Sequence, residues 1–195
     1  MASLDQLWAG WRSDFLERSI EEGRAAGTLQ PAVVGEAGGA GGPGNDGSDA
    51  KRCVFCRILA SGLSDEALHI VWRHPAGKAF VILNAYPYTS GHVMVMPVRH
   101  VSAVEDLGPD EGVDLWGTVV AAVRAIKSAY QPEGVNLGAN LGRAAGAGVP
   151  GHFHMHVVPR WFGDTNFMTS VANARVLPEA LDASAAKLRA SWLRE

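Results

Sequence analysis

The chain has 195 residues, of which 47% are hydrophobic and 19% are charged, and its formal net charge is −3. This composition can bury a core, and the length suits one domain with a short extension, which excludes a disordered or fibrous chain. The slight acidity argues against a broadly basic surface, so we expect no nucleic-acid partner, whereas a small anionic ligand in a locally positive pocket remains compatible with it.

The N-terminus has neither the pattern of a signal peptide nor that of a membrane helix. Acidic residues and tryptophans occur early in "MASLDQLWAGWRSDFLERS". No stretch of the chain approaches the roughly 18 apolar residues that a membrane helix requires. We therefore expect a soluble, cytoplasmic protein with no membrane partner.

Two segments precede the predicted domain. Residues 1–22 are expected to form an amphipathic helical arm, because apolar residues recur near helical spacing at Leu4, Leu7, Trp8, Trp11, Phe15 and Leu16. Residues 23–50 are predicted to be a flexible linker, since "EAGGAGGPGNDGSDA" consists mostly of residues that cannot bury a core. The folded domain is predicted to span residues 51–195.

Within this domain, apolar residues alternate between strand and helix periods. Short β-rich runs predict strands at residues 79–83, 92–96, 134–142 and 152–159, the first two forming an antiparallel pair. Helical patterns predict a short helix in "RCVFCRILAS", a long helix over 109–130 and a closing helix over 178–195. In the long helix one apolar stripe contains Val113, Trp116, Val120, Val123, Ile126 and Tyr130. This order predicts an α+β fold with a mainly antiparallel sheet.

Three of the seven histidines stand at alternate positions in "GHFHMHVVPRW". On a strand, His152, His154 and His156 share one face roughly 7 Å apart, while the apolar residues between them face the core. A chance cluster on a solvated face, a pure metal site and a catalytic site are three interpretations of this row. His69 and His74 lie outside any motif, and we interpret both as ordinary surface or loop residues.

Nucleophilic catalysis is the interpretation that we favour. A neutral imidazole nitrogen attacks phosphorus well when its other nitrogen donates a hydrogen bond that fixes the tautomer. Flanking histidines can orient it, hold phosphate oxygens and assist the leaving group. The preceding glycine-rich loop over 142–151, which includes Gly148, has side chains small enough for backbone N–H groups to approach an anion.

These motifs resemble those of a known family. "HFHMHVV" matches the His-φ-His-φ-His-φ-φ signature of the histidine triad (HIT) superfamily of nucleotide hydrolases and transferases. "CVFCRI" and "FVILNAYPYTSGHVMVMPVRHVSAVEDL" are similar to further segments of its members. "PRWFGDTNF" and "LWAGWRSDFL" resemble the branch that includes bacterial diadenosine tetraphosphate (Ap4A) phosphorylases. The resemblance implies a HIT-like fold and supplies roles for individual residues.

By this resemblance His154 is the nucleophile that takes up the nucleoside monophosphate, and His156 contacts phosphate and helps the leaving group. His92, in "SGHVMV", supports the triad from the preceding strand. Asn84 matches a residue that reaches the ribose hydroxyls, and Asn140 matches one that binds the α-phosphate. For both asparagines the alternative is a turn or strand-end residue that bonds its own backbone.

The two cysteines, Cys53 and Cys56, stand at CxxC spacing. They fit a redox pair or half of a metal site, and no thioredoxin-like pattern surrounds them. In zinc-bearing relatives the remaining ligands come from positions that correspond here to His100 and His152. The resemblance thus implies a closed Cys2His2 zinc site that braces the fold. It implies neither a catalytic metal nor an organic cofactor.

The resemblance implies nucleotidyl transfer from Ap4A through a covalent nucleotidyl-histidine. ATP would leave first, and phosphate would then release ADP, or water would release AMP. Because the loop "GAGVPG" lacks a serine associated with phosphorylases of this branch, a hydrolase of dinucleotides or nucleoside phosphoramidates is an alternative. A zinc-binding module without turnover is an alternative of another class. A homodimer is expected from the resemblance alone.

Overall fold

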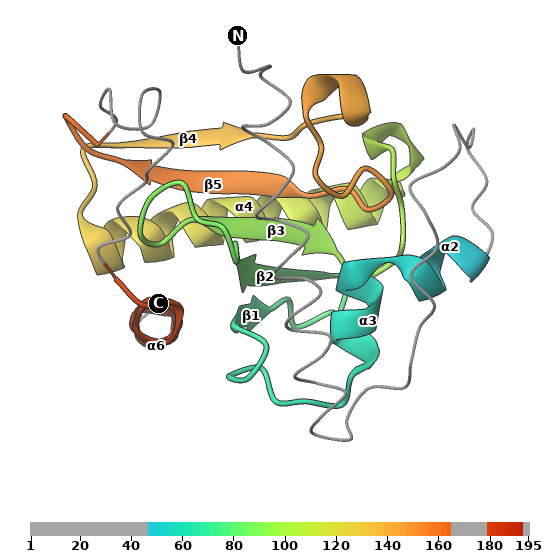
Figure 1. The fold of residues 1–195 in the computed structure, drawn as a ribbon, viewed down its shortest axis with the longest axis horizontal. Coiled ribbons are helices and arrows are strands. Elements are labelled where there is room, and N and C mark those ends of the chain that lie inside the picture. The colour runs from blue at the N-terminus through green and yellow to red at the C-terminus, as the bar shows by residue number, and fades with distance from the viewer. Residues whose placement is uncertain (1–46, 165–178, 193–195) are drawn as a thin grey trace, which may run out of the picture. The chain divides into compact units, whose positions relative to one another are not determined.

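The computed structural model describes residues 47–164 and 179–192, and these residues form a five-stranded antiparallel sheet with helices on its two faces (Figure 1). The strand order is β1-β2-β3-β5-β4. The strands are β1 (Ile70–Arg73), β2 (Ala79–Leu83), β3 (Val93–Pro97), β4 (Gly134–Gly138) and β5 (Met155–Arg160). The helices are α2 (Gly47–Arg52), α3 (Val54–Ala60), α4 (Pro109–Tyr130) and α6 (Leu181–Trp192), with short 3-10 helices η2 (Val104–Asp106) and η3 (Arg143–Ala145). The predicted α+β class with a mainly antiparallel sheet is confirmed.

The predicted arm over 1–22 and most of the predicted linker lie outside the described residues. Helix α2 begins at Gly47, within the last residues assigned to that linker. Asp49 in its first turn and Lys51 and Arg52 in its last turn complement the helix dipole, which favours a helix there despite the glycine-rich context. The domain boundary at residue 51 stays a prediction.

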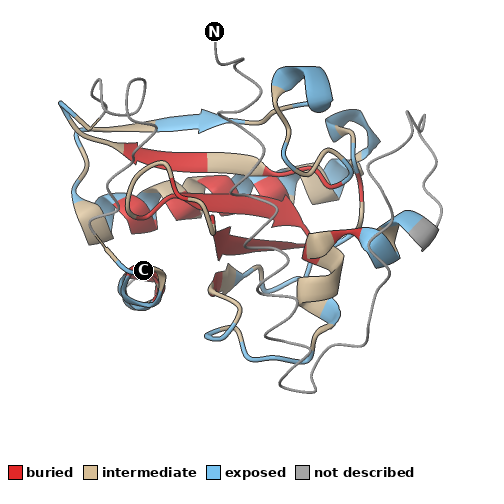
Figure 2. Ribbon diagram, in the orientation of Figure 1, coloured by how far each residue is buried: buried red, intermediate tan, exposed pale blue. Residues whose placement is uncertain are grey.

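The sheet separates two apolar layers, and its central strands are buried on both faces (Figure 2). Successive side chains of a strand point to opposite faces. Val81 of β2 therefore packs toward the layer that contains α4 and α6, whereas Phe80 and Ile82 pack toward Phe55 of α3. Strands covered on both sides read as continuous apolar runs, which is why "AFVIL" and "VMVMP" were recognisable.

Strand β1 was not predicted. It contains only four residues, "IVWR", and pairs with β2 through an irregular register between Ile70 and Trp72. A segment this short offers no alternation long enough to separate it from a loop. Its pairing with β2 and its cover by α6 are tertiary contacts that no local pattern encodes.

The predicted apolar stripe of α4 matches the buried face only in part. Val113 and Trp116 are 72% and 55% exposed, whereas Ile126 is buried and Val123 and Tyr130 pack against the core. The buried residues are Leu115, Thr118, Val119, Ala122, Ala125 and Ile126. Ala122 and Ala125 let the helix approach the sheet closely between the larger buried side chains. Val113 and Trp116 leave an exposed apolar surface on α4.

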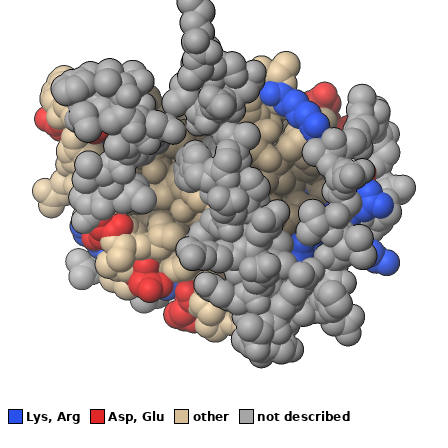
Figure 3. All heavy atoms as spheres, viewed as in Figure 1, with Lys and Arg blue, Asp and Glu red and all other residues tan. Residues whose placement is uncertain are grey.

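None of the helices in residues 47–164 and 179–192 is both long and apolar enough to span a bilayer. The charged side chains of the described residues that are visible in Figure 3 carry both signs on the same face. The cytoplasmic location and the lack of a membrane partner stay predictions.

Gly91 occupies a position that no other residue fits. Its φ of +80° lies in the left-handed region, and a Cβ there would lie 2.6 Å from Cε2 of Tyr130, at the end of α4. Both the backbone conformation and the close approach of the ring require glycine. Tyr130 thereby packs against the turn that leads into His92.

Replacing Gly91 with alanine should lower the free energy of unfolding by about 1–3 kcal/mol, through backbone strain and displacement of the Tyr130 ring. Gly112 is the matched control, because it lies in α4 and a Cβ added to it would have no heavy atom within 4 Å. Gly112→Ala should raise stability by about 0.5–1 kcal/mol. Urea denaturation of the variants measures both, and a Gly91→Ala protein as stable as the wild type would contradict the assignment.

Candidate functional site

The strand predicted over 152–159 begins three residues later, at Met155, so of the three histidines only His156 belongs to β5. His156 belongs to β5, where it faces Met94 of β3 and Gly138 of β4, and His154 directly precedes the strand. Phe153 packs in the apolar layer that contains α4, while Phe55 of α3 contacts the rings of His152 and His154. The imidazoles therefore lie on the α3 side of the sheet.

His154 has a tautomer that is fixed by the backbone. Its Nδ1 lies 2.8 Å from the carbonyl oxygen of His152, and the side chain is buried, with 6% exposure. A carbonyl oxygen only accepts hydrogen bonds, so Nδ1 carries the proton and donates it. In the neutral ring the lone pair is then on Nε2, which is the nitrogen suited to attack an electrophile.

His92 and His156 form a second ordered pair. The backbone N–H of Tyr88 donates to Nδ1 of His92 over 3.0 Å, and Nε2 of His92 lies 3.0 Å from Nδ1 of His156. His92 is fully buried, and an imidazole in that environment is most stable in its neutral form. Its single proton is then on Nε2 and is donated to His156, which places the proton of His156 on Nε2. The site thus combines one nitrogen with a lone pair and one N–H donor.

Asn84 is buried beside His92. Its Oδ1 accepts a hydrogen bond from the backbone N–H of Tyr86 over 3.0 Å, as in an Asx turn. Its Nδ2 lies 3.5 Å from Nδ1 and 3.4 Å from Nε2 of His92. This amide shapes the turn before β3, and its predicted contact with ribose stays a prediction.

Asn140 and Gly148 belong to the long connection between β4 and β5. Nδ2 of Asn140 donates to the carbonyl oxygen of Gly146 over 3.4 Å, and Gly148 is exposed. Gly142 and Gly146 both have positive φ values, so the loop twice adopts a backbone conformation that favours glycine. The predicted phosphate contacts of Asn140 and Gly148 stay predictions.

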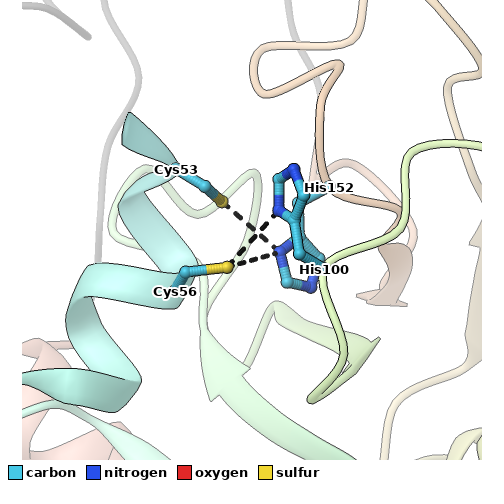
Figure 4. A group of neighbouring side chains, drawn as sticks. All are labelled: Cys53, Cys56, His100 and His152. Atoms are coloured by element: carbon cyan, nitrogen blue, oxygen red, sulfur yellow. Dashed lines mark hydrogen bonds between the residues drawn. The ribbon is translucent and has the colours of Figure 1, made fainter. Parts of the chain in front are cut away.

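The two cysteines and two histidines converge from three parts of the chain (Figure 4). Cys53 and Cys56 flank the start of α3, His100 follows β3, and His152 precedes β5. Nδ1 of His152 lies 3.4 Å from Sγ of Cys53 and 3.6 Å from Sγ of Cys56, and Nδ1 of His100 lies 3.4 Å from Sγ of Cys56. All four ligand atoms lie within 4.8 Å of one another.

These distances fit zinc. A tetrahedral zinc ion with Zn–S bonds of about 2.3 Å and Zn–N bonds of about 2.0–2.1 Å places each sulfur about 3.5 Å from each nitrogen. The three sulfur–nitrogen distances range from 3.4 to 3.6 Å. The donor set of two thiols and two imidazoles is also one that zinc prefers for structural sites.

His152 is prepared for ligation by its surroundings. Its Nε2–H donates to the carbonyl oxygen of Pro97 over 2.9 Å, which leaves the Nδ1 lone pair directed at the cysteines. Burial lowers the pKa of His152 to about 4, so the ring is neutral at physiological pH. Burial, together with the neighbouring Cys53, raises the pKa of the Cys56 thiol to about 12, so metal binding there must displace a proton.

Two aromatic residues of this region were missed in the sequence. The ring of Phe55 lies 5.5 Å from that of His152 and 5.6 Å from that of His154, and thus touches both the metal ligand and the candidate nucleophile. Tyr88 contacts His92 by backbone and by ring. Their only sequence signal is position: Phe55 stands between the cysteines, and Tyr88 stands in the turn before His92.

The other two histidines are engaged elsewhere in the described part of the chain. Nε2 of His69 lies 2.8 Å from Oδ1 of Asp182 in α6, and Nε2 of His74 lies 3.8 Å from Oδ1 of Asp114 in α4. Both contacts are of the surface type, as expected for histidines outside the motifs.

Comparisons with known proteins relate the chain to one family. A family model described as the HIT domain matches residues 74–163. A Mycobacterium tuberculosis protein named AP-4-A phosphorylase is 43% identical over 134 residues, which are 68% of this chain and 67% of the relative. A Schizosaccharomyces pombe protein named asymmetrical bis(5'-nucleosyl)-tetraphosphatase is 36% identical over 91 residues, or 47% of this chain and 48% of that protein.

A solved structure supports the same relationship. A zinc-bound histidine triad family protein from Mycobacterium smegmatis has a TM-score of 0.60 and 28% identity, and the match covers 74% of this chain and 96% of that chain. Sequence similarity over two thirds of both chains, together with the shared fold, shows that the chain belongs to the HIT family.

Proposed function

We propose that the protein is a nucleotidyltransferase that cleaves Ap4A with inorganic phosphate to give ATP and ADP. The observation that carries this proposal is the hydrogen bond from Nδ1–H of His154 to the carbonyl of His152, which leaves Nε2 as a nucleophile. The names of the mycobacterial and fission yeast relatives, both of which refer to dinucleoside tetraphosphate chemistry, support this substrate class.

The reaction proceeds in two displacements. Nε2 of His154 attacks the α-phosphorus, a P–N bond forms, and the P–O bond to the remaining phosphate chain breaks, so that ATP leaves with the bridging oxygen. Nε2–H of His156 donates to that oxygen as negative charge develops on it. An oxygen of inorganic phosphate then attacks the adenylate, the P–N bond breaks, and its electron pair returns to Nε2 as ADP departs.

Hydrolysis is the second candidate function. The loop before the triad, "GAGVPG", lacks a serine that the phosphorylase resemblance would supply, so water can compete with phosphate for the adenylate. In that case AMP replaces ADP as the second product, and dinucleotides or nucleoside phosphoramidates are the substrates.

Product analysis separates the two functions. With Ap4A and excess labelled phosphate, we expect equal amounts of ATP and ADP, with the label in the terminal phosphate of ADP. Chromatography of the nucleotides measures both. AMP as the main product at saturating phosphate would overturn phosphorolysis and favour the hydrolase.

His154→Ala should lower kcat by about 10³-fold or more, because the covalent route is lost. Acid-quenched wild-type enzyme should carry the adenylate on His154 in peptide mass spectrometry. His69→Ala, outside the site, is the matched control and should retain full turnover. If neither the wild type nor His154→Ala turned over the substrate, a zinc-binding module without turnover would be favoured.

We also propose that Cys53, Cys56, His100 and His152 hold one structural zinc ion. When bound, the ion stabilises the fold by joining α3 to the segment after β3 and the segment before β5. The closed set of four protein ligands leaves no position for a reacting water, so the chemistry is left to His154 and His156.

Cys56→Ser should reduce the zinc content from about one equivalent per chain to a small fraction of it and lower the thermal unfolding midpoint. Elemental analysis of purified protein and thermal unfolding measure the two effects. His74→Ala, which removes a histidine outside the cluster, should change neither. Full zinc retention in Cys56→Ser would contradict the site.

We further propose that the protein is a homodimer that uses the exposed apolar surface of α4. Val113 and Trp116 project from this helix, and Leu137 on the edge strand β4 is also exposed. Val113 and Trp116 are one helical turn apart, and an exposed apolar surface on a helix is typical of a protein interface.

Trp116→Glu should convert the dimer to a monomer, because it places a charge in the apolar interface. Light scattering coupled to size-exclusion chromatography measures the mass. Leu63→Glu replaces an exposed leucine after α3 and should leave the dimer intact. A wild-type monomer, or a Trp116→Glu dimer, would contradict the proposal.

A further inference from the structure

We propose that Tyr88 is a positioning residue for departure of the leaving group. Its backbone N–H sets the tautomer of His92, and its ring holds the His92 and His156 rings so that His156 directs Nε2–H at the leaving oxygen. This inference rests on the proposed function, because it assigns a role in the first displacement.

The turn that carries Tyr88 is firmly attached to the sheet. The backbone N–H of Asn84 donates to the carbonyl of His92 over 3.0 Å, and the N–H of His92 donates to the carbonyl of Thr89 over 3.2 Å. The hydroxyl of Thr89 donates to the carbonyl of Pro159, near the end of β5, over 2.7 Å. Tyr88 is therefore presented to the histidines by a braced segment and not by a loose loop.

The rings of Tyr88, His92 and His156 form a compact group. The Tyr88 ring centroid lies 4.7 Å from that of His92 at 45°, and 6.1 Å from that of His156 at 27°, which is a stacked arrangement. The two imidazole centroids are 5.1 Å apart. An imidazole packed against an aromatic face cannot rotate about its χ2 bond without losing that contact. The Tyr88 ring thus restricts the orientation of the donor.

The backbone N–H of Tyr88 determines which ring nitrogen of His92 carries the proton. Because its N–H occupies Nδ1 of His92, the proton of His92 lies on Nε2 and is donated to Nδ1 of His156. If His92 turned over, Nδ1 of His156 would lose this donor and could take up the proton itself. Nε2 of His156 would then direct a lone pair at an oxygen that gains negative charge, which opposes departure. Tyr88 opposes that arrangement through its backbone N–H, which bonds His92, and through its ring, which packs against His92 and His156.

A role in leaving-group departure predicts a specific pattern of rates. Phenyl and p-nitrophenyl esters of AMP present the same α-phosphorus, but phenolate is the more basic leaving group and depends more on a proton donor. Loss of a correctly directed donor should therefore slow the phenyl ester and largely spare the p-nitrophenyl ester. A defect confined to packing would slow both esters alike.

The test compares Tyr88→Leu with Tyr88→Phe on the two esters. We expect Tyr88→Leu to lower kcat for the phenyl ester about 10-fold or more, with less than about a 2-fold change for the p-nitrophenyl ester. Tyr88→Phe retains the aromatic ring, so it should behave as the wild type on both; both variants keep the backbone N–H that bonds His92, so the comparison isolates the ring. NMR of the histidine ring nitrogens should show His156 protonated at Nε2 in the wild type and in Tyr88→Phe, and a mixture of tautomers in Tyr88→Leu.

Equal slowing of both esters in Tyr88→Leu, no slowing of either, or a Tyr88→Phe protein as impaired as Tyr88→Leu would overturn the inference. Thermal unfolding and zinc content serve as folding controls, and Tyr88→Met replaces Tyr88→Leu if the latter does not fold. The adenylate on His154 in wild-type enzyme separates the two levels: its absence refutes the proposed function, whereas its presence with unchanged ester selectivity refutes only the role of Tyr88.

Discussion

The hydrogen bond between Nδ1–H of His154 and the carbonyl of His152 is the interaction on which the rest of the site depends. The two groups are only two residues apart, so their geometry depends on where the His152 backbone lies. That backbone is held because the His152 side chain is bonded to Pro97 and surrounded by the two cysteines and His100. The Cys2His2 cluster and the proposed nucleophile are therefore joined by a single residue, and the order of one supports the order of the other.

The site uses backbone groups to assign a different state to each imidazole. The Pro97 carbonyl directs a lone pair of His152 to the cysteines, the His152 carbonyl places the lone pair of His154 on Nε2, and the Tyr88 N–H, through His92, places the proton of His156 on Nε2. An unsatisfied buried polar group costs about 1–3 kcal/mol, so alternative tautomers are disfavoured before any ligand arrives. Rings of one chemical type can thus hold, attack and donate without reorganising during the reaction.

Local signals in the sequence were sufficient for part of this site and insufficient for the rest. The alternation of His152, His154 and His156 and the CxxC spacing are short patterns with direct geometric meaning, and they pointed to a common side for the imidazoles and to the two cysteines of the cluster, although only His156 lies in β5. His100 required a family resemblance, because nothing local joins it to Cys56. The Tyr88 ring and the buried face of α4 depend on packing between distant segments, where side-chain size and turn geometry override apolar periodicity.

The way in which β5 begins explains the position of His154, the proposed nucleophile. The ladder between β3 and β5 ends at the Val95–Met155 pair, and in the same register Phe153 would face Pro97, which has no N–H to donate. The segment before Met155 therefore leaves the ladder, and the N–H of Phe153 donates instead to Val101 over 2.6 Å. Beyond the ladder, the Pro97 carbonyl accepts from Nε2–H of His152 and the His152 carbonyl accepts from Nδ1–H of His154, so this strand terminus positions both the proposed nucleophile and a candidate metal ligand.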